Sequence, residues 1–296
     1  MGESSVTSDE PAPSTRETVL IAAGELRRLI DGGSAPAVLD VRWRLERPDG
    51  RAEYRAGHIP GAVYVSLEDD LSDHTRAGRG RHPLPSGRHV EAAARRWGVR
   101  RDQPVVVYDD WNRAGSARAW WVLTAAGLSD VRILDGGLPA WVSAGGALQG
   151  GEVTPEPGDV GVTVDDLYTG GRRTLTASQV SVGVVATLLD ARAPERFRGE
   201  VEPVDPVAGH IPGARNLPSA AVLGDGGEFL GDARLAALLT GCGVDPRGGV
   251  GVYCGSGVTA SVVVAALGAI GVDAALFPGS WSQWSNDARP VATGPG

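Results

Sequence analysis

The chain has few cysteines, no long hydrophobic segment and no cluster of basic residues. Its two cysteines among 296 residues, Cys242 and Cys254, cannot form a disulfide framework, and their scarcity fits a reducing compartment. The longest apolar stretch, Ser261 to Val272, is too short to cross a bilayer. The formal net charge of −8 disfavours a nucleic-acid-binding surface. We therefore expect a cytoplasmic protein that binds neither nucleic acid nor membrane.

The amino-terminal segment, residues 1–16, is polar and acidic. It has neither the positive start nor the apolar run of a secretory signal, and we expect it to be disordered. No spacing of cysteine and histidine is typical of a metal site, so neither a metal ion nor another cofactor is expected. The length and the 42% hydrophobic content are sufficient for two domains with cores of their own.

Four landmarks occur twice in the chain, in the same order and at similar separations. They are a strand ending in Asp-x-Arg (37–42 and 188–192), GHIPGA (57–62 and 209–214), an apolar run with tyrosine and the two residues after it (105–110 and 250–255), and a segment ending in tryptophan (Trp141 and Trp284). Such self-similarity indicates a duplicated domain. The matched tryptophans are interpreted as packing anchors.

Strands rich in valine and leucine alternate with helical stretches in each copy, such as Val90 to Trp97 and Ala233 to Leu239. This alternation predicts an α/β fold, with a parallel sheet flanked by helices in each domain. We assign residues 17–148 to the first domain and 173–296 to the second. The Gly- and Pro-rich segment 149–172 has the composition of a linker.

Cys254 lies where a predicted core strand, residues 248–253, meets a glycine loop and then a helix. The first N–H groups of a helix have no partner within it and carry partial positive charge. A thiolate at Cys254 would be stabilised there and would be nucleophilic near neutral pH. The loop residues that supply donors are Gly255, Ser256, Gly257, Val258 and Thr259. The alternative interpretation is a buried structural cysteine.

The two copies differ at this position, and the difference separates function from fold. Asp109 stands where the second copy has Cys254, and we expect its carboxylate to serve only as a favourable charge at a helix start. Arg196 replaces Glu53, so the copy with the cysteine also gains an arginine. A guanidinium can hold a carboxylate or sulfonate through paired hydrogen bonds. A weak surface pair with a neighbouring glutamate is the alternative role for Arg196.

The motif CGSGVT at 254–259, the duplicated HIPGA, HPLP at 82–85 and the Arg-Phe pair at 196–197 resemble the rhodanese family of sulfurtransferases, and more narrowly the mercaptopyruvate sulfurtransferases. The resemblance extends from about Glu17 onward. It implies two tandem rhodanese-like domains, the first non-catalytic and the second catalytic. It also implies that Cys254 carries sulfur, as a persulfide, from a small anionic donor to cyanide or to a thiol acceptor, either a small thiol or a thioredoxin-like protein.

The same resemblance implies roles for individual residues. Arg196 would bind the anionic end of the donor, and the loop serine, Ser256, would act with a first-domain histidine and a nearby aspartate, carried over here as His58 and Asp49. The second arginine that commonly follows a Glu-Pro pair is absent after Pro203. A neutral loop with one nearby arginine suits one carboxylate better than a dianion, which favours 3-mercaptopyruvate over thiosulfate as donor.

Other interpretations remain open at this point. A cysteine phosphatase would need an arginine at the end of the loop, where Thr259 and Ala260 stand. A non-catalytic module that senses persulfides or binds a partner would have the same fold. GHIPGA occurs in both copies, so His210 is interpreted as structural. Cys242 is interpreted as a core residue because no redox spacing links it to Cys254.

Overall fold

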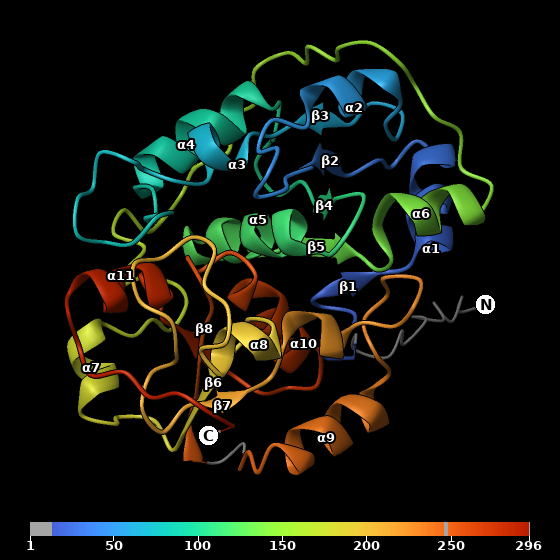
Figure 1. Ribbon diagram of the computed structural model, residues 1–296. Coiled ribbons are helices and arrows are strands. Elements are labelled where there is room, and N and C mark those ends of the chain that lie inside the picture. The colour runs from blue at the N-terminus through green and yellow to red at the C-terminus, as the bar shows by residue number, and fades with distance from the viewer. Residues whose placement is uncertain (1–13, 246–247, 296) are drawn as a thin grey trace, which may run out of the picture.

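Two parallel sheets, one from each half of the chain, lie on either side of a central pair of helices (Figure 1). The computed structural model describes residues 14–245 and 248–295. The first sheet has the strand order β1-β5-β4-β2-β3 and the second β7-β6-β8-β9, and all neighbouring strands are parallel. The predicted α/β architecture with two tandem domains is confirmed.

The elements of the first half begin at β1. Its strands are β1 (Leu20–Ile21), β2 (Ala37–Asp40), β3 (Val63–Tyr64), β4 (Val105–Tyr108) and β5 (Val131–Leu134). Its helices are α1 (Ala23–Asp31), α2 (Arg51–Ala56), α3 (Leu67–Asp70), α4 (Gly87–Arg96), α5 (Ala114–Ala125) and α6 (Gly137–Ser143). The predicted helix from Val90 to Trp97 corresponds to α4, which begins one turn earlier because Ser86 caps it by accepting a hydrogen bond from the His89 N–H.

The second half repeats this alternation. Its strands are β6 (Thr187–Asp190), β7 (Arg215–Asn216), β8 (Val250–Tyr253) and β9 (Ala274–Leu276). Its helices are α7 (Ala177–Ser181), α8 (Pro194–Phe197), the 3-10 helix η1 (Ser219–Val222), α9 (Asp232–Gly241), α10 (Ala260–Ala269) and α11 (Ser280–Asn286). The predicted helix from Ala233 to Leu239 lies within α9, and β8 and α10 flank Cys254 as predicted.

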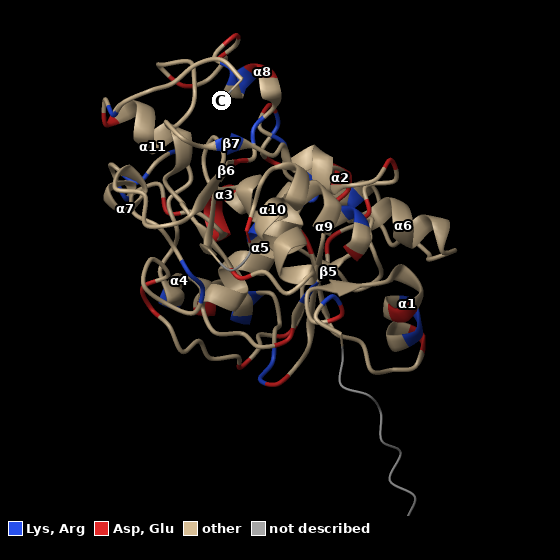
Figure 2. Cartoon of the chain, turned by 90° about the horizontal axis from the view of Figure 1, so that it is seen from below, with Lys and Arg blue, Asp and Glu red and all other residues tan. Residues whose placement is uncertain are grey.

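Helices α5 and α10 are buried on every face. In α5 only Thr124 is not buried, and in α10 only Gly268. Side chains of both helices belong to one hydrophobic cluster that runs from the first domain into the second. Figure 2 shows acidic and basic residues spread around the periphery of the molecule, whereas α10, near the centre, has none. Burial of this apolar helix pair holds the two domains together.

The repeated motifs form the same structural contacts in both domains. His58 and His210 each bond through Nδ1 to a backbone carbonyl, of Tyr54 at 2.9 Å and of Phe197 at 2.8 Å, and each ring stacks on the same residue's ring. The structural interpretation of GHIPGA is therefore confirmed for His210 and extends to His58. The buried Trp141 and Trp284 each donate to a backbone carbonyl at 2.8 Å, which confirms them as packing anchors.

The segment between the domains packs onto the first of them. Residues 149–172 contain no helix or strand, but Gln149 exchanges two backbone hydrogen bonds with His58, and the Gly158 N–H donates to the Arg95 carbonyl at 2.8 Å. Leu175 then joins the second sheet by donating to Leu276 at 2.7 Å. The segment with linker composition is therefore irregular in structure but hydrogen-bonded to the first domain.

The expectation of a disordered amino-terminal segment can be compared with the structure only from Ser14 onward. Residues 1–13 lie outside the described residues. Residues 14–16 are ordered, contrary to the expectation of disorder up to residue 16, because Arg16 forms ion pairs with Asp135 at 3.2 Å and Asp232 at 3.0 Å. Among the described residues, no helix combines the length and apolar character needed to cross a membrane.

Candidate active site

The Cys254 loop is held in place from behind by the start of α11. The Cys254 N–H donates to Ser280 Oγ at 3.1 Å, and the Cys254 carbonyl accepts from the Trp281 N–H at 3.0 Å. The next carbonyl, that of Gly255, accepts from the Ser282 N–H at 2.8 Å. Ser280 adopts a positive φ of 53°, which is uncommon for a residue other than glycine. These contacts fix the backbone, and hence the sulfur atom, at the end of β8.

The loop that follows Cys254 offers backbone donors, one of which contacts the sulfur atom. The Gly257 N–H donates to Cys254 Sγ at 3.1 Å. Gly257 has a φ of +79°, and a Cβ there would come within 2.5 Å of the Pro278 carbonyl oxygen, so only glycine fits. Within the part of the chain that the structure describes, four further loop N–H groups have no acceptor, those of Gly255, Ser256, Val258 and Thr259. They can stabilise a negative charge on sulfur.

A chain of polar side chains runs from the loop into the first domain. Ser256 Oγ lies 2.7 Å from His82 Nδ1, and His82 Nε2 lies 3.2 Å from Glu68 Oε1. Ser256 and His82 are both buried, with exposed fractions of 6% and 3%. The chain links the cysteine loop of the second domain to α3 and the HPLP segment of the first. It has the geometry of a serine, histidine and carboxylate relay.

The charges of this relay determine its direction. Burial raises the pKa of Glu68, but hydrogen bonds from His82 and Trp43 outweigh burial and hold it at about 2. Burial lowers the pKa of His82 below 6.5, against the raising effect of Glu68. At neutral pH an ionised Glu68 can only accept, so a neutral His82 donates from Nε2 and accepts at Nδ1. The Ser256 hydroxyl therefore donates to His82.

The residues predicted for this relay, His58 and Asp49, do not take part in it. His58 is fully buried against Tyr54 in the GHIPGA turn. The Asp49 carboxylate accepts from the Arg51 N–H at 2.9 Å and from the Tyr64 hydroxyl at 3.2 Å. Both side chains are engaged in the first domain, whereas His82 contacts Ser256. The assignment of His58 and Asp49 was therefore wrong.

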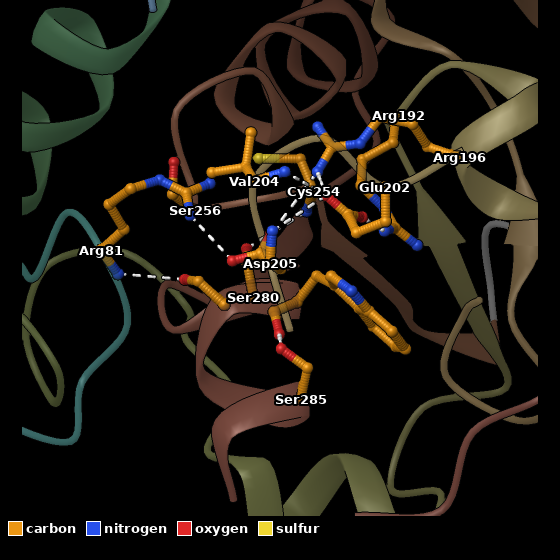
Figure 3. Close-up of polar contacts among 12 residues, drawn as sticks. Arg81, Arg192, Arg196, Glu202, Val204, Asp205, Cys254, Ser256, Ser280 and Ser285 are labelled. Carbon is orange, nitrogen blue, oxygen red and sulfur yellow. Dashed lines mark hydrogen bonds and ion pairs between the residues drawn. The ribbon is translucent and has the colours of Figure 1, made fainter. Parts of the chain in front are cut away.

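Arg196 lies beside the loop, in a network of buried carboxylates. Its Nη2 donates to Glu202 Oε1 at 2.6 Å and lies 3.5 Å from Asp205 Oδ2. Both carboxylates are 3% exposed, whereas the Arg196 side chain is 18% exposed. The pair is therefore not the weak surface pair considered as the alternative. Figure 3 shows Asp205 between this group and Arg81 of the first domain, whose Nη1 donates to Asp205 Oδ1 at 2.8 Å.

A further guanidinium lies beneath the loop. Arg118 of α5 is fully buried and donates to the carbonyls of His82 at 3.0 Å, Leu71 at 3.1 Å and Gly257 at 3.4 Å. Burial lowers the pKa of Arg118 to about 10, so it remains a cation at neutral pH. Its charge and that of a Cys254 thiolate attract each other across the domain interface.

The corresponding loop of the first domain is filled by its own carboxylate. Asp109 accepts from the backbone N–H groups of Trp111, Arg113 and Ser116, and pairs with the Arg113 guanidinium at 2.9 Å. This confirms Asp109 as a favourable charge at a helix start. The N–H groups that bind the Asp109 carboxylate are therefore not free to bind an external anion.

His82, Arg81 and Arg118 were missed as site residues. HPLP occurs in one copy only, so the comparison of the two copies could have identified His82. Arg118 is the one charged residue in the apolar helix α5, which was a second signal. Among the described residues, no group of three or more His, Cys, Asp or Glu side chains could hold a metal ion.

Comparisons with known proteins identify the family. The family model of the rhodanese-like domain matches residues 22–144 and 175–287. SseB of Mycobacterium tuberculosis is 67% identical over 94% of this chain and 98% of its own length. Its name describes it as a thiosulfate sulfurtransferase by assignment. The 3-mercaptopyruvate sulfurtransferase of Escherichia coli is 38% identical over 83% of this chain and 88% of its own. The crystal structure of SseA from Escherichia coli gives a TM-score of 0.78 at 34% identity, covering 90% of this chain and 99% of that one.

The chain belongs to the rhodanese family. It has two rhodanese-like domains and is a sulfurtransferase, which confirms the family, the fold and the enzymatic nature that the sequence predicts. The alternative of a non-catalytic module is therefore not retained.

Replacing Asp109 by alanine is expected to destabilise the first domain. The change leaves the fully buried Arg113 guanidinium without its carboxylate, which costs roughly 3–5 kcal/mol. The measurement is the free energy of unfolding in guanidinium chloride. The control is Asp110→Ala, which removes a pair with the partly exposed Arg44 and should cost less than about 1 kcal/mol. Equal stability of Asp109→Ala and the wild type would contradict the prediction.

Proposed function

We propose that the protein moves a sulfur atom from a small anionic donor, 3-mercaptopyruvate in preference to thiosulfate, through a persulfide on Cys254 to a thiol acceptor. The observation that carries this proposal is the position of Cys254 Sγ, 3.1 Å from the Gly257 N–H in a loop whose other N–H groups have no acceptor among the described residues. Backbone donors in such a loop can stabilise a thiolate before the reaction and a persulfide anion after it.

In the first step the Cys254 thiolate attacks the sulfur atom of 3-mercaptopyruvate. A sulfur–sulfur bond forms, the carbon–sulfur bond breaks, and its electron pair leaves on the enolate of pyruvate. The donor's S–H proton must reach the enolate carbon for pyruvate to form. Ser256, which donates to His82, can receive that proton as its own passes to the ring and can then return it. Glu68 stabilises the His82 cation that exists between the two transfers.

In the second step an acceptor thiolate attacks the outer sulfur of the persulfide. The new bond forms on that sulfur and the Cys254 thiolate leaves, which restores the starting state. A small thiol or a thioredoxin-like protein is the proposed acceptor, and cyanide replaces it in an assay. The cytoplasm is the proposed compartment because Cys242 and Cys254 are both free thiols.

The donor preference rests on charge. Arg196 is one of three guanidiniums around the loop, with Arg81 and Arg118, so the expectation of a single nearby arginine was wrong. Asp205 and Glu202 already neutralise two of them. The site therefore has little excess positive charge, and a monocarboxylate suits it better than a dianion. The names of these relatives divide between the two donors, thiosulfate for SseB and 3-mercaptopyruvate for the Escherichia coli protein.

The persulfide intermediate can be detected directly. After incubation with 3-mercaptopyruvate alone, the wild-type protein should be one sulfur atom heavier by intact mass, and peptide analysis should locate that atom on Cys254. Cys254→Ser should gain no sulfur and should form no thiocyanate from cyanide. Cys242→Ser is the matched control and should gain sulfur as the wild type does. A folded wild type without added sulfur after either donor would refute the proposal.

Loss of the relay should lower the rate and change its dependence on pH. Because burial lowers the pKa of His82, the ring is neutral above 6.5 and the acid limb of kcat/KM for 3-mercaptopyruvate should have its midpoint below 6.5. His82→Gln should remove this limb and reduce kcat by about 10²-fold. His74→Gln is the control, since the exposed His74 contacts Glu68 Oε2 but not Ser256. An unchanged profile in His82→Gln would exclude the relay.

The donor preference has a simple kinetic test. We expect kcat/KM for 3-mercaptopyruvate to exceed that for thiosulfate by about tenfold or more, which corresponds to ~1.4 kcal/mol. The measurement is thiocyanate formation with each donor at saturating cyanide. A preference for thiosulfate would show that the charge argument is incorrect while leaving the persulfide step intact.

A further inference from the structure

Two arginines from different domains converge on the Cys254 loop. A Cβ atom built on Gly255 would lie 3.3 Å from Arg81 Nη2 and 3.7 Å from Arg196 Nη1. Among the described residues these two nitrogen atoms have no hydrogen-bond acceptor, although the opposite nitrogen of each guanidinium is bound to a carboxylate. Each arginine therefore turns an unused donor towards the residue that follows the nucleophile.

Asp205 sets the spacing of the two guanidiniums. Its Oδ1 accepts from Arg81 at 2.8 Å and its Oδ2 lies 3.5 Å from Arg196. The carboxylate is 3% exposed, whereas the arginine side chains are 27% and 18% exposed. Asp205 thus holds both cations from the buried side and leaves their outer edges accessible. Figure 3 shows this arrangement, with Asp205 between the two arginines.

Arg81 also lines a groove at the surface. A groove of 370 Å³ lies between the domains, and its lining includes Gly80, Arg81, Val204, Asp205 and Ser282. Arg81 is fixed in this wall because its N–H donates to Ser282 Oγ at 3.0 Å and because Gly80, with a φ of +87°, lies directly against Gly279. Arg81 therefore borders both this groove and the Cys254 loop.

We propose that Arg81 is a donor-binding residue, and that Arg81 and Arg196 together hold the carboxylate of the sulfur donor across the domain interface. The inference rests on the proposed function for the identity of the donor, and on the geometry for the site. A single guanidinium contacts a carboxylate from one side only. Two guanidiniums on opposite sides fix the carboxylate in position and direct the sulfur atom of the donor towards Cys254. The first domain thus provides half of the anion site.

The test compares two alkylating agents that differ in charge. Iodoacetate and iodoacetamide react alike, with the thiolate forming a sulfur–carbon bond and expelling iodide, but only iodoacetate carries a carboxylate. In a Cys242→Ser background the rate of mass increase reports on Cys254 alone. The measured quantity is the iodoacetate-to-iodoacetamide rate ratio. This rate ratio does not depend on whether the protein transfers sulfur.

Arg81→Gln is expected to lower this ratio about tenfold, because one charge-assisted contact to the carboxylate is lost. It should also raise KM for 3-mercaptopyruvate about tenfold while kcat changes less than about threefold. The matched control is Arg79→Gln, two residues away, where the guanidinium lies over the Tyr168 ring at 4.8 Å. Its ratio and KM should stay within about twofold of the wild-type values.

An unchanged rate ratio in folded Arg81→Gln overturns the proposal. If that variant does not fold, the double variant Arg81→Gln/Asp205→Asn, which leaves no buried carboxylate unpaired, is judged by the same ratio. A wild type that favours iodoacetate through Arg81 but forms no persulfide supports the anion site and refutes the sulfur donor. If the wild type forms the persulfide but Arg81→Gln changes neither the alkylation rate ratio nor KM, the sulfur transfer is supported and the anion site is refuted.

Discussion

The packing of α5 against α10 is the contact on which the site depends. Both helices are apolar on almost every face, so each domain leaves a large hydrophobic surface that only the other domain covers. This burial fixes the orientation of the domains. Arg118, from α5, and the segment that contains Arg81 and His82 then contact the Cys254 loop within hydrogen-bond distance. The hydrophobic effect has no preferred direction, but by fixing the two domains it positions hydrogen bonds whose geometry is directional.

The fold was predictable because its signals are local or repeated. The landmarks that recur in both halves placed β2, β4, β6 and β8, and the glycine loop between β8 and α10 placed Cys254 at a strand end. The comparison of the two copies correctly separated Asp109 from Cys254 and predicted a structural role for His210. The catalytic role predicted for His58 came from the family resemblance and was wrong, because the shared motif is structural in both copies.

The rest of the site could not be predicted because it depends on contacts across the domain interface. Ser256 and His82 are separated by 174 residues, and no periodicity links them. Arg81 precedes HPLP in an irregular segment, where the sequence does not determine the direction of a side chain. Arg118 was a detectable exception in an apolar helix, but its partner carbonyls, those of Leu71, His82 and Gly257, follow only from the packing of the domains.

The Asp109 loop shows what duplication made possible. A carboxylate built into the chain occupies the donors that an incoming anion would need, and Arg113 closes the pocket around it. The first domain nevertheless contributes to the other half of the molecule, because its buried His82 and Arg118 contact the Cys254 loop. In the proposed mechanism the catalytic unit is consequently the whole chain: a fragment with the second domain alone would lack His82, Arg118 and Arg81 together.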